Sequence, residues 1–251
     1  PSDELRDLAD TFDEMLGRID DAFESQREFI HEASHELRNP LAVIRTNIDV
    51  ALGDPDADAE ELRSISEVVG RSAERMTTLV DDLLLYARHG ERTTREEDFD
   101  LVEIVGNLAE EFEAPAEARG LVLTLNISDQ TLPVCGDTPA VRRAVANLLA
   151  NAIRLAPSGT SVTVACARHD DWNTITIADE GPGIPPEDHH RVFQRFWRGD
   201  KQEAREQGRS GLGRTIVRQV MEGHGGRVDL SSNANDGSTF ILWFPESQNQ
   251  V

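Results

Sequence analysis

Apolar residues recur every three or four positions over the first ninety residues of the chain, where glycine is rare. This spacing predicts long helices that each bury one narrow apolar stripe. A turn-forming segment, Gly53-Asp54-Pro55-Asp56, separates two such stretches. We therefore expect a coiled-coil helix over residues 1–24, followed by an antiparallel helical hairpin over residues 25–90.

A single hairpin of this kind leaves much of each apolar stripe in contact with water. Pairing two hairpins into a four-helix bundle removes that surface from solvent. The pattern therefore predicts a homodimer. The alternative is a monomeric hairpin that packs against the chain's own downstream domain.

The pattern changes after residues 91–98, a polar and charged stretch that we expect to be a linker. Residues 99–246 are mixed, and residues 247–251 form a short tail. Helices are predicted over 101–119, 140–155 and 212–222, and strands over 121–127, 161–167, 174–178, 227–231 and 238–244. Because strands follow one another with no helix between them, a doubly wound parallel sheet is excluded. The predicted fold class is α plus α/β, a helical hairpin followed by an α/β sandwich.

The net charge limits the classes of binding partner, and the cysteine content indicates the redox state of the thiols. The 251 residues carry a formal net charge of −22, which disfavours nucleic acid and anionic membrane as partners of the surface as a whole. The two cysteines, Cys135 and Cys166, lie in separate apolar stretches, and we expect buried, reduced thiols of a cytosolic protein. No apolar run approaches the roughly 20 residues that span a bilayer.

His35 is a candidate nucleophile because of its position on the first predicted helix. It lies two residues from both Ala33 and Leu37, so at about 100° per residue it turns away from the apolar stripe into solvent. An exposed imidazole can act as a nucleophile near pH 7. Asn39 lies one turn later on the same face, and Pro40 is expected to bend the helix there. Taken alone, a solvated surface histidine remains the alternative.

The segment His35-Glu36-Leu37-Arg38-Asn39-Pro40-Leu41, with Phe29 six residues before the histidine, resembles the H box of the histidine kinase dimerisation and phosphoacceptor domain. The resemblance implies that His35 accepts the γ-phosphoryl group of ATP. It also implies that Glu36 assists this transfer and that Asn39 serves dephosphorylation of a partner response regulator.

A second set of candidate residues lies in the α/β region. Asn147 and Asn151 are one turn apart on an otherwise apolar helix, where amide oxygens suit phosphate surroundings and a hard cation. Asp179-x-Gly181-x-Gly183 follows a strand directly, and a glycine cluster over residues 208–213 opens a helix, a natural place for phosphate oxygens. The alternatives are internal hydrogen bonds for the asparagines and an ordinary turn for the aspartate.

Charge gives an independent argument for an anionic ligand. Eight basic residues between Arg191 and Arg218 are opposed by three acidic ones, in a chain that is otherwise strongly acidic. A basic, glycine-punctuated loop in this setting fits a triphosphate. Solvated surface charge is the alternative.

Together these segments, with Val192-Phe193-Gln194-Arg195-Phe196 and Gly237-Ser238-Thr239-Phe240, resemble the Bergerat-type ATP-binding domain of histidine kinases, type II topoisomerases, heat-shock chaperones and mismatch-repair ATPases. The resemblance implies ATP and Mg²⁺ as cofactors, with Asn151 binding the metal and Asp179 the adenine amine. The remaining residues implied around the nucleotide are Asn147, Arg154, Gly181, Gly183, Gly211, Leu212 and Gly213.

Four residues depart from the usual pattern of that domain. Arg154 stands where lysine is usual, Leu155 where an aromatic residue is, Arg209 where glycine is and Arg214 where leucine is. None of the four departures changes the expected fold. We expect them to affect ATP affinity and closure of the loop over the nucleotide.

Residues 3–15 resemble the second helix of a HAMP relay module, with Arg6 in place of the usual glycine. An unrelated coiled coil is the alternative. A HAMP module implies transmembrane segments before the sequence given, so we expect this chain to be the cytoplasmic portion of an inner- or plasma-membrane protein and to meet the membrane only through those segments.

The expected function is therefore a dimeric sensor histidine kinase that autophosphorylates His35 and passes the group to a response regulator. Two rival functions remain: a module with weak kinase and dominant phosphatase activity, and an ATPase of the chaperone or topoisomerase type. The H box disfavours the second rival, because such machines need no phosphoacceptor.

Overall fold

The computed structural model describes residues 2–54, 57–87, 97–127, 130–195, 197 and 211–246. The chain forms two compact units, Pro1–Asp81 and Asp82–Val251. The expected fold class is confirmed, because a helical N-terminal unit precedes a domain built on a mixed sheet.

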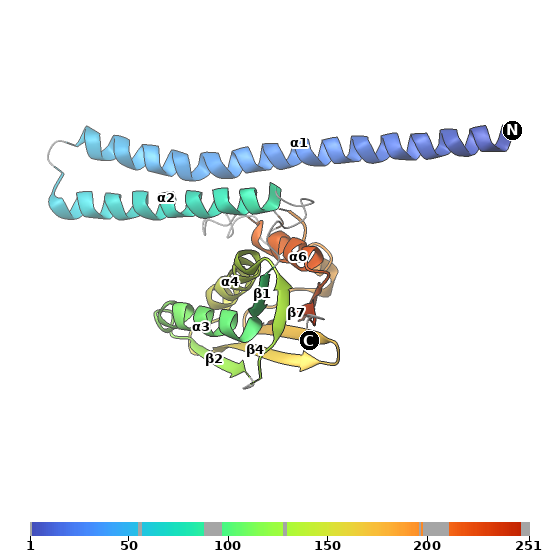
Figure 1. Cartoon of the computed structure of the whole chain (residues 1–251). Coiled ribbons are helices and arrows are strands. Elements are labelled where there is room, and N and C mark those ends of the chain that lie inside the picture. The colour runs from blue at the N-terminus through green and yellow to red at the C-terminus, as the bar shows by residue number, and fades with distance from the viewer. Residues whose placement is uncertain are drawn as a thin grey trace. The chain divides into compact units, whose positions relative to one another are not determined.

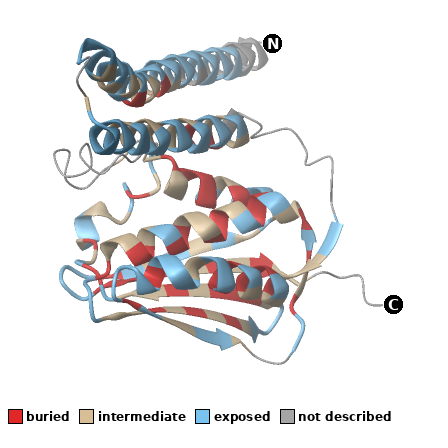
Figure 2. Ribbon diagram, turned by 90° about the vertical axis from the view of Figure 1, so that its left-hand side faces the viewer, coloured by how far each residue is buried: buried red, intermediate tan, exposed pale blue. Residues whose placement is uncertain are grey.

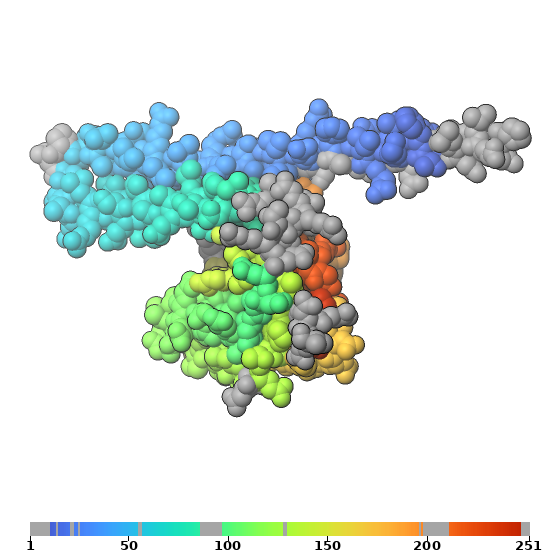
Figure 3. All heavy atoms as spheres, viewed as in Figure 1, coloured from blue at the N-terminus to red at the C-terminus, as the bar shows by residue number. Residues whose placement is uncertain are grey.

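Two helices make up the first unit. Helix α1 runs without interruption over Ser2–Gly53, so the predicted coiled-coil helix and the first arm of the hairpin are one element that continues through Pro40. Helix α2, Ala59–Ala87, returns alongside it after a short turn (Figures 1 and 3). Asp58 caps α2, since its carboxylate accepts from the backbone N–H of Glu61 at 2.9 Å while the Glu61 side chain accepts from the N–H of Asp58 at 3.2 Å.

The first unit buries little of its apolar surface within a single chain. Ala33 and Leu79 are buried, but many large apolar side chains of α1 and α2 stay exposed. They are Phe12, Met15, Leu16, Ile19, Phe23, Ile30, Leu41, Val43, Ile48, Val50, Leu52, Leu62, Val80 and Leu84. This uncovered surface is what the predicted homodimer would bury. None of the described helices has the length and hydropathy that crossing a membrane requires.

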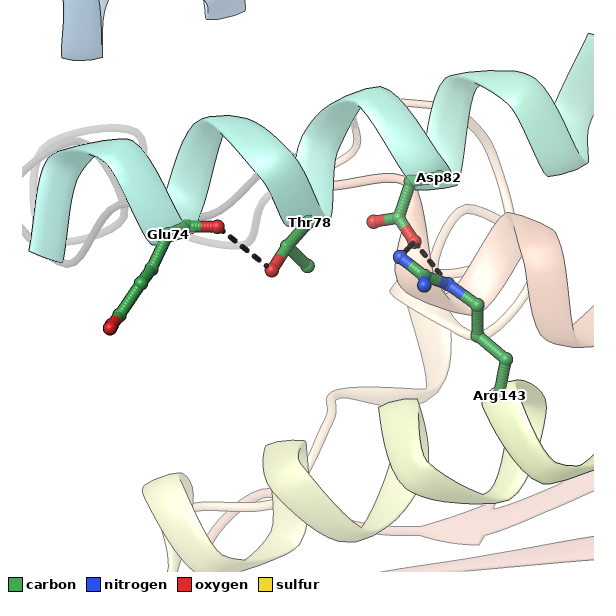
Figure 4. Close-up of polar contacts among 4 residues, drawn as sticks. All are labelled: Glu74, Thr78, Asp82 and Arg143. Atoms are coloured by element: carbon green, nitrogen blue, oxygen red, sulfur yellow. Dashed lines mark hydrogen bonds and ion pairs between the residues drawn. The ribbon is translucent and has the colours of Figure 1, made fainter.

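The second unit begins inside α2, at Asp82. This carboxylate is only 3% exposed and its Oδ1 accepts two hydrogen bonds from Arg143, at 3.0 Å from Nε and 2.7 Å from Nη2 (Figure 4). A buried carboxylate needs such a partner, because leaving it unpaired is strongly destabilising. The ion pair accounts for the last turns of α2 belonging to the second unit. One turn earlier, the Thr78 hydroxyl donates to the carbonyl of Glu74 at 3.2 Å.

A five-stranded mixed sheet carries the second unit, in the order β2-β4-β5-β7-β6. Strands β2 and β4 are parallel, and the other neighbours are antiparallel. A separate antiparallel pair joins β1 and β3. In chain order the elements are β1 (Glu97–Asp100), α3 (Leu101–Glu117), β2 (Val122–Ile127), β3 (Pro133–Gly136), α4 (Thr138–Leu155), β4 (Ser161–His169), β5 (Trp172–Asp179), the 3-10 helix η1 (Pro186–Asp188), α6 (Gly213–Gly223), β6 (Arg227–Ser232) and β7 (Ser238–Pro245).

The core lies between one face of this sheet and the helices α3, α4 and α6. Buried residues gather in that layer (Figure 2). Every second residue of β7, and of β4 as far as Cys166, is buried there, including Val162, Val164, Leu242 and Phe244, as expected for a sheet covered on one face. On the opposite face the guanidinium of Arg227 stacks on two tryptophan rings, those of Trp172 and Trp243.

Two sequence expectations are corrected. The segment 91–98 is not wholly a linker, because Glu97 and Asp98 begin β1, and β3 was not expected at all. The sequence pattern of β1 does not predict a strand because several of its residues are charged. Such residues are tolerated there because β1 belongs to a two-stranded sheet with an exposed face. Cys135 is exposed rather than buried, because it alternates along β3 with the inward-facing Val134 and Gly136. Cys166 is buried, as expected.

Candidate functional site

Helix α4 presents a polar stripe beside its buried face. Asp137 caps the helix by accepting from the backbone N–H of Ala140 at 2.9 Å. The core-facing residues of α4 are apolar, whereas Asn147, Asn151 and Arg154 are half-buried and follow one another along the helix. The two asparagines are one turn apart, so they lie on the same face, as the spacing predicts.

The first residue of α6 lies against Asn147. A β-carbon added at Gly213 would lie 3.4 Å from Cγ of Asn147, and α4 and α6 run side by side (Figure 1). Nδ2 of Asn147 is buried, and within the described part of the chain it has no hydrogen-bond partner. A buried donor without a partner is costly in a folded protein. Its presence at a glycine-opened helix N-terminus therefore fits a ligand that supplies oxygen acceptors, such as a nucleotide phosphate.

Gly211 and Leu212 precede α6 and complete this glycine segment. Gly211 adopts a φ of +68°, in the left-handed region that favours glycine. The side chain of Leu212 is fully buried, so any contact with a nucleotide falls to its backbone. The rest of the predicted basic loop, including Arg198, Lys201, Arg205, Gly208 and Arg209, lies outside the described residues.

Asp179 ends β5 and is held by the turn that follows it. Its Oδ1 accepts from the backbone N–H of Gly181 at 2.8 Å. Burial raises the pKa of Asp179, and the backbone N–H groups of Gly181 and Ser238 offset part of that effect. A half-buried carboxylate fixed in this way is suited to accept a hydrogen bond from a ligand amine. A β-carbon at Gly181 would lie 3.2 Å from the carbonyl oxygen of Leu155, so this turn lies against the end of α4.

The turn between β6 and β7 fixes the loop after Asp179. The N–H of Asn235 donates to Pro182 O at 2.7 Å, and the N–H of Gly237 donates to Gly181 O at 3.1 Å. Gly183 and Gly237 have φ values of +69° and +70°. A β-carbon at Gly183 would meet Asn233 O at 1.7 Å. The two glycines are therefore required by close backbone packing, whatever they contribute to a ligand.

Arg154 contacts the residue predicted to bind the metal. Its Nη2 donates a hydrogen bond to Oδ1 of Asn151. This amide oxygen is the atom that a Mg²⁺ ion would take as a ligand. A bound cation must therefore displace Arg154 or share the site with a rearranged guanidinium.

Three residues that the sequence interpretation missed hold these segments in place. Arg119 donates to the last carbonyls of α4, to Ile153 O and Arg154 O, both at 3.0 Å. Thr215 of α6 donates to Phe193 O at 3.1 Å, and His224 at the end of α6 accepts from the N–H of Asp137 at 2.9 Å. These pairs join residues 22 to 87 positions apart, so local patterns carry no signal for them.

Other predicted positions are placed as follows. Val192 is buried, and the ring of Phe193 meets that of Phe240 edge-on at 6.2 Å. Phe196 lies outside the described residues. Arg214, which stands where leucine is usual, lies over the ring of Trp197 at 5.0 Å. Phe193 thus contacts the sheet, and Trp197 contacts the start of α6.

The predicted phosphoacceptor lies in the first unit. His35 is exposed on α1, as its spacing from Ala33 predicts, and Asn39 one turn later is exposed too. Glu36 is half-buried. The ring of His31 stacks on that of His35, with centroids 4.5 Å apart and planes inclined by 26°.

Comparisons with known proteins match two families to separate parts of the chain. Residues 25–92 match the family "His Kinase A (phospho-acceptor) domain", and residues 136–248 match the family "Histidine kinase-, DNA gyrase B-, and HSP90-like ATPase". The sensor protein CutS of Streptomyces coelicolor is 33% identical over 246 residues, which cover 98% of this chain and 59% of CutS. This chain therefore spans little more than half the length of that relative.

Solved structures of histidine kinases are also similar to this chain. The mycobacterial sensor histidine kinase MprB is 32% identical with a TM-score of 0.52, over 61% of this chain and 98% of that one. The fold also matches histidine kinase ThkA in a complex with the response regulator TrrA, with a TM-score of 0.70 at 22% identity, over 89% of this chain and 63% of that one. From the two domain matches and these relatives, the chain belongs to the sensor histidine kinases of two-component signalling systems.

Proposed function

We propose that this chain transfers the γ-phosphoryl group of Mg²⁺-ATP to His35 and then to an aspartate of a response regulator. One observation supports the proposal above all: the first residue of α6 lies against Asn147 of α4, whose buried Nδ2 has no hydrogen-bond partner among the described residues. The Asp179 turn lies against the end of the same helix, and the chain also carries an exposed histidine in an H box.

In this proposal the residues of the second unit hold and orient the nucleotide. Asp179 accepts from the adenine amine, and the amide of Asn147 and the backbone of Gly211–Gly213 face the phosphates. Asn151 offers its amide oxygen to Mg²⁺, which neutralises phosphate charge when bound. Catalysis of phosphoryl transfer rests on such positioning and electrostatics rather than on covalent chemistry by the protein.

At His35 a ring nitrogen forms the new N–P bond with its lone pair, and the bond from the γ-phosphorus to the β,γ-bridging oxygen breaks and leaves ADP. Glu36 accepts a hydrogen bond or proton from the ring as positive charge develops there. Asn39, one turn away on the same face, orients water in the reverse, phosphatase role toward the regulator. The homodimer and the membrane attachment implied by the HAMP-like segment belong to the same proposal.

Incubation of the purified chain with γ-labelled ATP and Mg²⁺ tests this function. We expect label that is lost in acid and kept in base, that disappears in His35→Gln and that persists in His190→Gln, a matched change at another exposed histidine. Asn151→Ala should lose nucleotide binding. Label that survives His35→Gln, or unchanged ATP affinity in Asn151→Ala, would contradict the proposal.

A second candidate function is supported by the contact between Arg154 and Asn151. If the guanidinium competes with Mg²⁺ for this oxygen, kinase activity is weak and phosphatase activity dominates. Kinase and phosphatase rates measured with one purified response regulator separate the two. Arg154→Lys, which restores the usual residue, should raise the kinase rate if the competition is real and leave it unchanged if it is not.

A further inference from the structure

His31 and His35 form an exposed imidazole pair on α1. They are four residues apart on one helix, their ring centroids are 4.5 Å apart and the planes are inclined by only 26°. Both residues are exposed, so the stack is a surface feature and not a packed part of the helical unit. Nothing in the proposed phosphoryl transfer requires His31.

The pair lies on a side of α1 that the described contacts do not cover. Ala33 and Pro40 are the buried residues nearby, and His35 lies about 160° around the helix from Ala33 at 100° per residue. At 100° per residue, the exposed apolar residue Ile30 lies about 100° around the helix from His31. The exposed Leu41 lies about 80° from His31 and about 120° from His35. The side that a helical partner would cover is thus distinct from the side that carries both imidazoles.

Two imidazoles with this spacing are a chelating unit. Imidazole nitrogen is a preferred ligand of Zn²⁺, Cu²⁺ and Ni²⁺, and histidines at i and i+4 share one helical face. A zinc ion takes ring nitrogens at about 2.0–2.1 Å, which at a tetrahedral angle sets them roughly 3.3 Å apart. The ring centroids are 4.5 Å apart. Because the rings stack, both side chains must rotate on the open surface to turn a nitrogen lone pair of each toward one ion.

We propose that His31 and His35 bind a divalent transition-metal ion such as Zn²⁺, and that the bound ion withholds His35 from phosphoryl transfer. No third His, Cys, Asp or Glu completes a cluster among the described residues, so water fills the other positions and the ion exchanges readily. The metal and the phosphoryl group compete for the same histidine, which makes the site inhibitory. This second part rests on the proposed role of His35. Mg²⁺, a hard cation with oxygen ligands, does not compete for the pair.

Binding is tested first, without nucleotide. Zn²⁺ is titrated into the full chain by calorimetry, and the same titration is run on His31→Gln, His35→Gln and the control His190→Gln. Because each of the first two leaves one ligand of a chelate, we expect the affinity to fall at least about tenfold in both and to stay within about twofold in the control. Wild-type affinity in His31→Gln would overturn the site.

Regulation is tested second, with the free Zn²⁺ concentration set by a metal buffer because ATP also binds this ion. The measured quantity is the ratio of autophosphorylation rates with and without Zn²⁺, taken within each protein. The ratio should fall well below one in wild type and in His190→Gln and stay near one in His31→Gln. Equal inhibition of His31→Gln would overturn the regulatory role. A wild-type chain that binds Zn²⁺ through both histidines but never becomes phosphorylated would support the metal site and refute the proposed function.

Discussion

Asn147 and Gly213 face each other across the start of α6, with a β-carbon position at Gly213 only 3.4 Å from Cγ of the asparagine. The amide Nδ2 of Asn147 is buried there and unpartnered within the described part of the chain. A donor in this state lowers stability unless a ligand satisfies it. The asparagine at position 147 therefore lowers the stability of the ligand-free protein and supplies a hydrogen-bond donor for a ligand.

Replacing Asn147 by leucine, a residue of similar shape, should make the ligand-free second unit more stable and abolish nucleotide binding. The expected gain is about 1 kcal/mol, from removal of an unsatisfied donor. All three tryptophans, at positions 172, 197 and 243, lie in the second unit, so fluorescence during denaturation reports this unit alone. Asn107→Leu, on the exposed side of α3, corrects for the higher helix propensity of leucine. A gain no larger than this control, or retained ATP binding, would refute the interpretation.

Asp179→Asn should also stabilise the ligand-free protein at neutral pH. Burial raises the pKa of Asp179, so folding favours the protonated carboxyl. Its contribution to stability is fully present below the ordinary value of 3.8 and is lost as pH rises through the folded-state pKa. The variant cannot ionise, so its advantage over wild type should grow from pH 3 to pH 7 in fluorescence-monitored denaturation, while ATP affinity falls.

The neighbouring Glu180 provides a control of opposite sign. The hydroxyl and the backbone N–H of Ser161 donate to its carboxylate at 2.7 and 3.0 Å and lower the pKa of Glu180. This contribution is present above the ordinary value and is lost as pH falls through the folded-state pKa. Glu180→Gln should therefore be less stable than wild type at pH 7, with a difference that shrinks in acid. Differences of the same sign in both variants would contradict the assignment.

Gly183→Ala should unfold the second unit far more easily than Gly159→Ala. Both glycines have φ in the left-handed region, at +69° and +87°, which costs an alanine about 1 kcal/mol. At Gly159 a β-carbon meets open space, whereas at Gly183 it would lie 1.7 Å from the carbonyl oxygen of Asn233. We expect a loss of about 3 kcal/mol or more at Gly183. Equal losses in the two variants, measured by urea denaturation, would show that the loop around Gly183 shifts to accommodate the added methyl group.

His224→Ala should destabilise the second unit by about 1–3 kcal/mol, because it leaves the part-buried N–H of Asp137 without its acceptor. Nδ1 of the same ring lies 2.6 Å from Val220 O, so it carries the proton and Nε2 is the acceptor. His190→Ala, at an exposed histidine, should change the free energy of unfolding by no more than about 0.5 kcal/mol. A loss at His224 as small as that would mean that water replaces the ring.

The elements with strong periodicity were predictable from the sequence. Helix α4 differs from its expected range only at the first turn, where Asp137 and Thr138 precede the apolar stripe. Strands β5 and β7 extend a residue or two beyond their expected ends. In each case burial follows a local alternation, so the pattern contains the information.

Features set by distant residues were not predictable. The pairing of β1 with β3 places Glu97 beside Gly136, and no local signal in four charged or aromatic residues indicates it. His224 lies at the end of α6, yet its ring accepts from the start of α4, 87 positions earlier in the chain. The stacking of His31 on His35 depends on side-chain rotamers, which spacing alone leaves open.

The contrast between the two thiols gives the protein a built-in attachment point. Burial, with a smaller contribution from Asp100, raises the pKa of Cys166 to about 12, so its thiolate is absent at neutral pH. Cys135 is exposed on β3, two residues before the cap of α4. A maleimide dye will therefore react at Cys135 alone and, with no engineered cysteine, report from the foot of the helix that carries Asn147 and Asn151.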